Sequence, residues 1–324
     1  MNDLIFAGHR CNDHSPSGGY DQVCSLFPDA GWLDGRALQA GRMEWQRRPQ
    51  QGDGVTPRVI HVFYGDCSGK ELPALLRQRF PGAAIVSSAH RPVARLESDE
   101  QARAALRASD AIITVSETQA HELRELALPA PIHPIPHGVW IDAFRPPTRS
   151  AGHHRKDVLI VGSFLRDWEG ARWVIERLAQ HDVRCIALGA GARGNLAGEG
   201  ALVDVRERVS ESELIALYEK SAAVFLPFLE ATASNALLEA MVAGCPVVCP
   251  RLPSLVEEYL DDTSDSFEPG QYTAAADRLL HYVRDPSARV ARSEQLMERV
   301  EVFDWSRLKP RYAAVFEQAR TRAS

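Results

Sequence analysis

The chain has 324 residues, which is long for a single hydrophobic core and sufficient for two domains. Its 37 basic and 43 acidic residues give a formal net charge of −6, which argues against a protein that binds duplex nucleic acid through a basic face. No apolar run approaches the ~20 residues that span a membrane, so there is no strong membrane signal. We expect a cytoplasmic protein, because the start MNDLIFAGHR lacks the pattern of a signal peptide.

Short β-branched segments alternate with longer amphipathic ones, which is typical of βαβ units and parallel sheets. Strands are expected in the first half at 4–8, 59–64, 83–90, 111–116 and 131–136. After a proline-containing linker at 144–157, a second series is expected at 158–164, 183–191, 201–207, 222–228 and 245–250. The sequence therefore predicts an α/β protein with two doubly wound Rossmann-like domains. The final segment is expected to be a helix that breaks near Pro310.

The segment ATASNALLEAMVAGCPVVCP, from Ala231 to Pro250, has the features of a helix start that binds a ligand. Small residues precede a helix that we expect to begin near Ser234, so its first N–H groups and positive dipole end are accessible to an anion. Glu239 follows within the helix, where a carboxylate can accept hydrogen bonds from the two hydroxyls of a ribose. The alternative interpretation is an ordinary capped helix with a surface glutamate.

Two other segments carry patterns that resemble motifs of other protein classes. The stretch GAGARGNLAGEG at 189–200 contains GxGxxG, but we expect no helix to open on it, and it lacks the downstream acidic residue of a dinucleotide site. We expect it to be a loop near the nucleotide base. A Rossmann oxidoreductase is therefore disfavoured. The acidic run DDTSD at 261–265 follows a helix in a turn-rich region and is expected to be solvated, and no cysteine and histidine spacing completes a zinc site.

Five segments in this order resemble retaining GT-B glycosyltransferases of glycosyltransferase family 4. They are SGGYDQV, AIITVSE, IPHGVWIDAF, VLIVGSF and PFLEATASNALLEAMVAGCPVV, and the last is the most specific. The resemblance spans nearly the whole chain and implies two Rossmann-like domains that face a central cleft. It implies an acceptor-binding domain at 1–148, a nucleotide-sugar-binding domain at 149–303, and a C-terminal helix at 304–324 that packs back on the first domain.

The resemblance also implies roles for individual residues. Glu239 would hold the nucleotide ribose, and His90 would lie near the donor sugar and the reacting centre. Ala231 and Thr232 would contact the sugar. The residues expected at the nucleotide diphosphate are Gly18, Gly19, Gly162, Ser234, Asn235 and Ala236. No cofactor and no metal ion are implied beyond the nucleotide-sugar co-substrate.

The chain departs from the family pattern at two places. The first of the family's paired glutamates would fall on Ala231, and Glu230 is one residue early. Either the loop carries one extra residue and Glu230 still reaches the sugar, or backbone groups around Ala231 and Thr232 take its role. The family also has an arginine and a lysine in the loop that here reads GSFLRDWEG, where Ser163 and Glu169 stand instead and Arg166 is the only cation. Charge stabilisation of the leaving diphosphate is usually a large catalytic term, so the loss matters unless Arg166 or another group substitutes, and Arg166 is the best cation available. The expected catalytic residues are thus His90, Glu230 and Arg166.

Together these features predict a metal-independent retaining glycosyltransferase that moves a sugar from a nucleotide-diphosphate sugar to a hydroxyl acceptor. The acceptor would be a specialised metabolite, a glycan or a carrier-linked substrate. Two alternatives stay open at this point: a catalytically weak nucleotide-sugar-binding protein with the same fold, and a GT-B sugar-phosphate epimerase or phosphorylase. The sequence identifies neither the base and sugar of the donor nor the oligomeric state.

Overall fold

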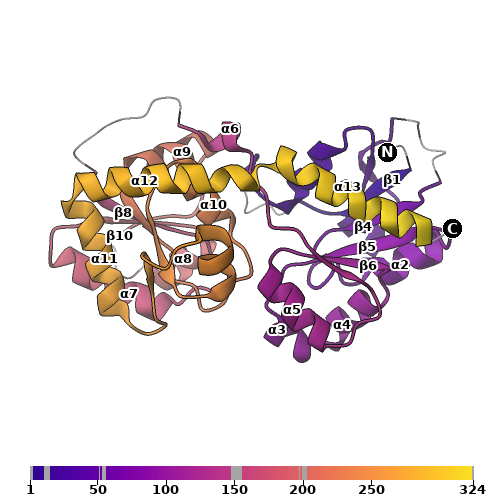
Figure 1. The fold of residues 1–324 in the computed structure, drawn as a ribbon, viewed down its shortest axis with the longest axis horizontal. Coiled ribbons are helices and arrows are strands. Elements are labelled where there is room, and N and C mark those ends of the chain that lie inside the picture. The colour runs from indigo at the N-terminus through magenta and orange to yellow at the C-terminus, as the bar shows by residue number, and fades with distance from the viewer. Residues whose placement is uncertain are drawn as a thin grey trace. The chain divides into compact units, whose positions relative to one another are not determined.

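The structure is a computed structural model that describes residues 3–10, 15–50, 52, 56–146, 155–196, 198 and 203–322. The chain divides into two compact units (Figure 1). The first comprises Met1–Asn12, Gly19–Gly138 and Trp305–Ser324, and the second comprises Asp13–Gly18 and Val139–Asp304. The domain boundary that the sequence predicts between 148 and 149, and most of the expected linker, lie outside the described residues.

The first unit is built on a seven-stranded sheet, as far as its described residues show, with the strand order β3-β2-β1-β4-β5-β6-β7. Neighbouring strands are parallel except for β2 and β3, which pair antiparallel. β2 and β3 were not among the expected strands, because GWLD and WQR contain no β-branched residue and gave no strand signal. The strands are β1 (Leu4–Gly8), β2 (Gly31–Asp34), β3 (Trp45–Arg47), β4 (Val59–Val62), β5 (Ala84–Ala89), β6 (Ala111–Thr114) and β7 (Ile132–Pro134).

Helices flank this sheet, and the last helix of the chain packs on it (Figure 1). Helix α13 runs unbroken from Trp305 to Arg322, so the expected break near Pro310 was wrong. Proline removes a single backbone donor there, whereas Trp305, Tyr312 and Phe316 are fully buried and hold the helix on the unit. The other helices are η1 (Tyr20–Leu26), α1 (Gly35–Gln39), α2 (Leu72–Arg79), α3 (Val93–Glu97), α4 (Glu100–Arg107) and α5 (Glu117–Glu125).

The second unit contains a six-stranded sheet within its described residues, with the order β10-β9-β8-β11-β12-β13 and parallel pairing throughout. Chain order reverses between β8 and β11. In open α/β sheets, ligands bind beyond the carboxyl ends of the strands at such a switch point. The strands are β8 (Asp157–Val161), β9 (Cys185–Leu188), β10 (Val203–Arg206), β11 (Ser221–Phe225), β12 (Val247–Pro250) and β13 (Ser266–Phe267).

The helices of the second unit include one that the sequence analysis excluded. Helix α8 begins at Ala190, directly after Gly189 with its positive φ of 119°, so the expectation that no helix opens on GAGARGNLAGEG was wrong. Glycines weaken helix propensity, but Ala192 and Leu196 are fully buried and tertiary packing decides. The helices are α6 (Ile141–Phe144), α7 (Trp168–Ala179), α8 (Ala190–Leu196), α9 (Glu211–Lys220), α10 (Asn235–Val242), the π-helix η3 (Ser254–Leu260), α11 (Tyr272–Arg284), α12 (Pro286–Val300) and η4 (Glu301–Phe303).

Asp265, the last residue of the acidic run at 261–265, lies in a buried ion pair, which corrects the expectation of a solvated run at this residue, whereas Asp261, Thr263 and Ser264 are exposed. Asp265 is 1% exposed and accepts hydrogen bonds from Arg292 and from the hydroxyl of Tyr282. Arg292 also contacts Asp262 at 2.9 Å. A buried carboxylate needs a partner of opposite charge, and α12 supplies it from outside the run. Within the described ranges, no group of three or more His, Cys, Asp or Glu side chains is arranged to hold a metal ion.

No helix in the part of the chain that the structure describes is both long enough and apolar enough to cross a membrane.

Candidate functional site

The start of α10 lies after the loop that follows β11. Ser234 caps the helix as the sequence predicts, because its Oγ accepts a hydrogen bond from Leu237 N at 3.2 Å. Within the described structure, the preceding amides of Asn235 and Ala236 make no hydrogen bond. Since Leu237 is fully buried, the helix start is rigid as well as capped. Two backbone N–H groups at the positive end of a fixed helix form a suitable anion site.

Glu239, in the second turn of α10, is buried and held by a tyrosine. Its exposed fraction is 5%, so the interpretation as a surface glutamate was wrong. Tyr218 is fully buried in α9, and its hydroxyl donates to Glu239 Oε2 at 2.9 Å. Desolvation raises the pKa of Tyr218 well above its ordinary value, and the adjacent carboxylate raises it further. The phenol therefore keeps its proton and stays a donor to Glu239.

The glycine loop of the second unit lies against the other oxygen of Glu239. A Cβ atom added to Gly18 would lie 2.9 Å from Glu239 Oε1 and 2.6 Å from Ser15 Oγ, so no other residue fits there without movement. The loop is anchored by Ser17, whose N and Oγ donate to Glu211 Oε2 and Oε1 at 2.6 and 2.9 Å. Glu211 is the first residue of α9, so one helix holds both the glycine loop and, through its last turn, Glu239.

The loop after β8 is braced by Arg166. Its Nε and Nη2 donate to the carbonyl of Val161 at 3.3 and 2.9 Å, and its Nη1 donates to the carbonyl of Phe164 at 2.7 Å. The guanidinium lies 4.0 Å from the ring centroid of Phe228. Desolvation lowers the pKa of Arg166, but arginine starts so high that it stays charged. Gly162 has a φ of 98°, and a Cβ there would lie 2.3 Å from Arg166 Nη2, so this position requires glycine.

The other residues of the β8 loop are used to fix it to the unit. Ser163 Oγ accepts a hydrogen bond from Gly191 N at 2.9 Å, which ties the loop to α8. Asp167 caps α7 by accepting from Gly170 N at 2.9 Å. Trp168, the first residue of α7, is half-buried and packs against the hydrophobic core. This packing indicates that Trp168 anchors the start of α7 to the core.

The residues just before α10 form the remaining wall of this site. Ser254 Oγ donates to the carbonyl of Ala231 at 2.7 Å, and Ala231 packs against the core. Thr232 is buried and Glu230 is half-buried. The backbone at 231 is therefore pinned, and the loop carries Glu230 and Thr232 directly to the helix start.

His90 lies in the first unit, at the carboxyl end of β5. Asp66 Oδ2 accepts hydrogen bonds from the amides of His90 and Arg91 at 2.8 and 2.6 Å and so fixes the turn. The rings of Tyr20 and Tyr64 lie with centroids 4.4 Å from the imidazole of His90. Desolvation of the fully buried Asp66 raises its pKa to about 6. The backbone of His90 is thus fixed by hydrogen bonds, and its imidazole packs against two tyrosine rings.

The structure distributes the predicted site residues over its two units. Gly19, with a φ of 95°, and His90 belong to the first unit. The loops after β8 and β11 pair at the switch point, since Leu229 N donates to Leu165 O at 2.9 Å. The predicted site residues that belong to the second unit, together with Tyr218, are called here the candidate α10 site: Gly18, Gly162, Arg166, Tyr218, Glu230, Ala231, Thr232, Ser234, Asn235, Ala236 and Glu239.

Sequence reasoning missed three residues that support these groups. Tyr218 and Glu211 sit in a regular helical pattern, and no local signal distinguishes them from other helix residues. Asp66 does carry a signal, because it is an acidic residue between glycines in the loop after a buried strand.

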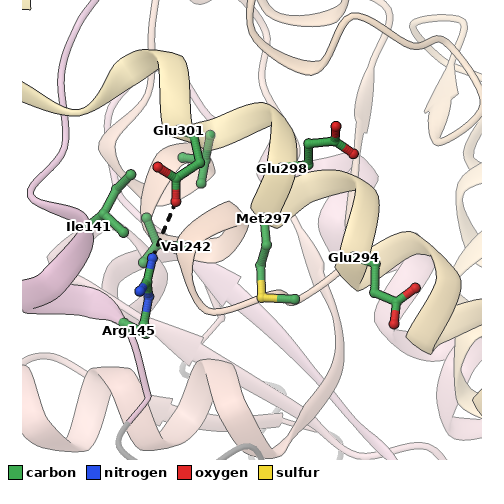
Figure 2. A pocket seen from close by; sticks show the side chains of 8 residues that line it. Ile141, Arg145, Val242, Glu294, Met297, Glu298 and Glu301 are labelled. Carbon is green, nitrogen blue, oxygen red and sulfur yellow. Dashed lines mark hydrogen bonds and ion pairs between the residues drawn. The ribbon is translucent and has the colours of Figure 1, made fainter. Parts of the chain in front are cut away.

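A pocket of about 340 Å³ lies elsewhere in the second unit (Figure 2). Arg145 and Glu301 form an ion pair at 3.3 Å beside it. Val242, which lines it, is the last residue of α10, at the opposite end from Asn235. The pocket is therefore separate from the α10 site. The other lining residues are Ile141, Glu294, Met297, Glu298 and Val300.

Comparison with solved structures places this fold in a known class. The sucrose-phosphate synthase of Thermosynechococcus elongatus is similar at 16% identity with a TM-score of 0.79, covering 99% of this chain and 100% of that one. HepE of Anabaena, solved in complex with UDP, matches at 14% identity and a TM-score of 0.70 over 97% and 99% of the two chains. The catalytic domain of starch synthase IV from Arabidopsis thaliana, bound to ADP and acarbose, matches at 15% and 0.63 over 94% and 79%. The two parallel-sheet Rossmann-like units thus form a GT-B fold.

Family comparison then gives the activity class. A family model described as "Glycosyl transferases group 1" matches residues 155–285, and one described as "Glycosyltransferase Family 4" matches residues 22–143. A search of curated proteins found no match. With matches in both halves of the chain and the GT-B fold, the protein is a glycosyltransferase of the family 4 kind.

Proposed function

We propose that this glycosyltransferase moves a sugar from a nucleotide-diphosphate sugar to a hydroxyl acceptor with retention of the anomeric configuration. The observation that carries the proposal is the α10 site, in which a buried carboxylate lies beside a capped helix start and a glycine loop. Burying a carboxylate is costly unless it serves a ligand or a structural pair. The phenol of Tyr218 donates to Glu239, and a ribose diol would supply further donors to the same carboxylate.

The donor class is supported by what the similar structures contain. HepE was solved with UDP and with UDP-glucose, and the starch synthase with ADP. In our proposal Glu239 binds the ribose, while the amides of Asn235 and Ala236 together with Ser234 face the diphosphate. Gly18, Gly19 and Gly162 let the backbone approach the phosphates closely.

Catalysis in this proposal depends on positioning and charge. His90, Glu230, Ala231 and Thr232 address the donor sugar, and Arg166 is the cation nearest the diphosphate. The acceptor attacks from the face that the diphosphate leaves, and the departing phosphate oxygen accepts the proton of the acceptor hydroxyl. No protein nucleophile is then needed, so geometry and electrostatic stabilisation supply the rate.

The domains divide these tasks in the proposal. Residues 1–148 bind the acceptor, residues 149–303 bind the nucleotide sugar, and the helix at 304–324 belongs with the acceptor domain. The acceptor is a specialised metabolite, a glycan or a carrier-linked hydroxyl compound, and the reaction takes place in the cytoplasm without a metal ion.

The test is a calorimetric binding screen of the purified protein against UDP-, GDP-, dTDP- and ADP-sugars, followed by analysis of released sugar. We expect one nucleotide to bind selectively and its sugar to be released slowly without acceptor. Glu239→Ala should weaken that binding by ~1.5–3 kcal/mol, because it removes hydrogen bonds to a charged group. The control is Glu268→Ala, which removes an exposed carboxylate paired with Arg251 at 3.3 Å. The proposal would be contradicted if none of the tested nucleotide sugars binds. It would also be contradicted if Glu239→Ala and the parent bind the nucleotide with equal affinity.

A further inference from the structure

A hydrogen bond from another helix orients the carboxylate of Glu239. A glutamate side chain has several rotatable bonds, so burial alone does not fix the plane of its carboxylate. Tyr218 is fully buried, and its hydroxyl lies 2.9 Å from Glu239 Oε2 but 3.5 Å from the carbonyl of Ala236. The shorter contact is to the charged acceptor, which forms the stronger bond. The phenol therefore holds Oε2 in one place.

Fixing Oε2 also fixes where the second oxygen points. Glu239 Oε1 lies toward the glycine loop, 2.9 Å from the position that a Cβ of Gly18 would take. A carboxylate accepts one hydrogen bond on each oxygen from two vicinal hydroxyls only when both oxygens are oriented toward them. The rigid ring of Tyr218, enclosed in the core around α9 and α10, supplies that orientation before any ligand arrives.

We propose that Tyr218 is a positioning residue that sets the selectivity of this site for a ribose over a sugar without vicinal hydroxyls, by holding the carboxylate of Glu239. This inference rests on the proposed function, in which Glu239 binds the ribose. Tyr218 touches the carboxylate and not the nucleotide, so it acts through Glu239 alone. Loss of its hydroxyl removes this restraint on Oε2.

The chain offers a matched control for the structural effect of losing such a bond. Tyr282, in α11 of the same unit, donates its hydroxyl to the buried carboxylate of Asp265. Tyr282→Phe removes the same kind of hydrogen bond, from a phenol to a buried carboxylate. Neither Tyr282 nor Asp265 belongs to the α10 site. Any general loss of stability or packing should thus occur in both variants, whereas an effect on ribose selectivity should occur only in Tyr218→Phe.

The experiment measures the affinity of the full chain for UDP, GDP and ADP and for the 2′,3′-dideoxy form of each by calorimetry. For the nucleotide that binds the parent, the ratio of the dideoxy to the ribo dissociation constant reports selectivity. We expect Tyr218→Phe to lower this ratio by roughly tenfold, while Tyr282→Phe keeps the parent value. Tyr218→Met, which also removes the hydroxyl and adapts its shape to the core, should lower the ratio as well.

The outcomes separate this inference from the proposed function. If the parent binds none of the three nucleotides and none of the nucleotide sugars in the screen, the proposed function fails and this inference fails with it. Binding of a dTDP-sugar alone overturns this inference and leaves the proposed transfer standing. If the parent prefers the ribonucleotide and Glu239→Ala removes the preference, the proposed function stands. In that case an unchanged ratio in Tyr218→Phe and Tyr218→Met overturns the role of Tyr218, and an equal fall in the ratio for Tyr282→Phe overturns it too.

Discussion

Replacement of Arg166 distinguishes a structural role in the loop after β8 from a catalytic role in the proposed reaction. In the structure its guanidinium braces the loop after β8 by binding the carbonyls of Val161 and Phe164. In the proposed reaction it also supplies the positive charge nearest the leaving diphosphate. Three of its hydrogen-bond donors are used in the brace, and arginine has five N–H donors, so both roles are compatible with one conformation.

The stability cost of Arg166→Ala can be worked out from these contacts. Phe164 is 67% exposed, so water can replace the arginine at its carbonyl and that bond contributes little. The carbonyl of Val161 loses a charged donor, which costs about 1.5–3 kcal/mol. The contact with the ring of Phe228 at 4.0 Å adds about 1 kcal/mol. We expect the free energy of unfolding to fall by about 2.5–4 kcal/mol in total.

Arg299 provides the control for a brace without a role in the reaction. It donates from Nε to the carbonyl of Tyr259 at 3.0 Å and from Nη2 to the carbonyl of Glu258, and it lies 5.2 Å from the ring centroid of Phe303. Arg299→Ala should therefore destabilise the protein comparably and leave the kinetic constants close to those of the parent below the unfolding temperature.

The assay combines denaturant unfolding with kcat and KM for the donor identified in the screen. We expect Arg166→Ala to lower kcat by more than tenfold with a smaller change in donor affinity, because charge on the leaving group matters most in the transition state. Arg166→Lys keeps the charge but loses the two hydrogen bonds to the carbonyl of Val161. The lysine variant should therefore be less stable than the parent, yet have a higher kcat than Arg166→Ala. Equal kcat in the alanine variant and Arg299→Ala would refute a catalytic role, and parental stability would refute the brace.

Two further predictions concern buried carboxylates. Burial raises the pKa of Asp66 from 3.8 to about 6, so between these values the folded state holds a proton that the unfolded chain has lost. The contribution of Asp66 to stability therefore rises as pH falls through 6 and is complete below ~4. In denaturant unfolding, the parent should gain at most ~3 kcal/mol of stability relative to Asp66→Asn over this pH range. A difference in stability that does not change with pH would contradict the raised pKa of Asp66. Arg292→Ala leaves Asp265 buried without its cation and should cost about 3–5 kcal/mol in the same assay, whereas a loss under ~1 kcal/mol would show that water reaches Asp265.

The sequence predicts most of the fold because its strands carry strong local signals. Segments such as VLIV at 158–161 are β-branched and fully apolar, which is the mark of a strand covered on both faces of a parallel sheet. β2 and β3 lack that composition, and they exist because the neighbouring strand β1 offers an unpaired edge. Helix α8 is similar, since its glycines oppose a helix and its buried leucine supports one. Such elements depend on tertiary contacts that a local pattern does not contain.

The start of α10 is predictable for the same reason that the strands are. The cap at Ser234, the small residues before it and the glycine stop at Gly244 all act within a few residues of each other. What the local pattern could not show is that Glu239 would be buried. That depends on Tyr218, which is 21 positions away and reaches Glu239 only after α9 and α10 have packed together.

Helix α9 gives the physical reason why the α10 site acts as one structure. Its first residue, Glu211, holds the amide and hydroxyl of Ser17, which is 194 positions away, and its last turn carries Tyr218. The hydrogen bonds of Ser17 and Tyr218 therefore place Gly18 and Glu239 from opposite ends of one rigid element. A glycine loop alone, or a glutamate on a helix alone, is common and weakly informative. Their joint attachment to α9, with no side chain at Gly18 beside Glu239 Oε1, is the arrangement that our proposal requires of a ligand that contacts both.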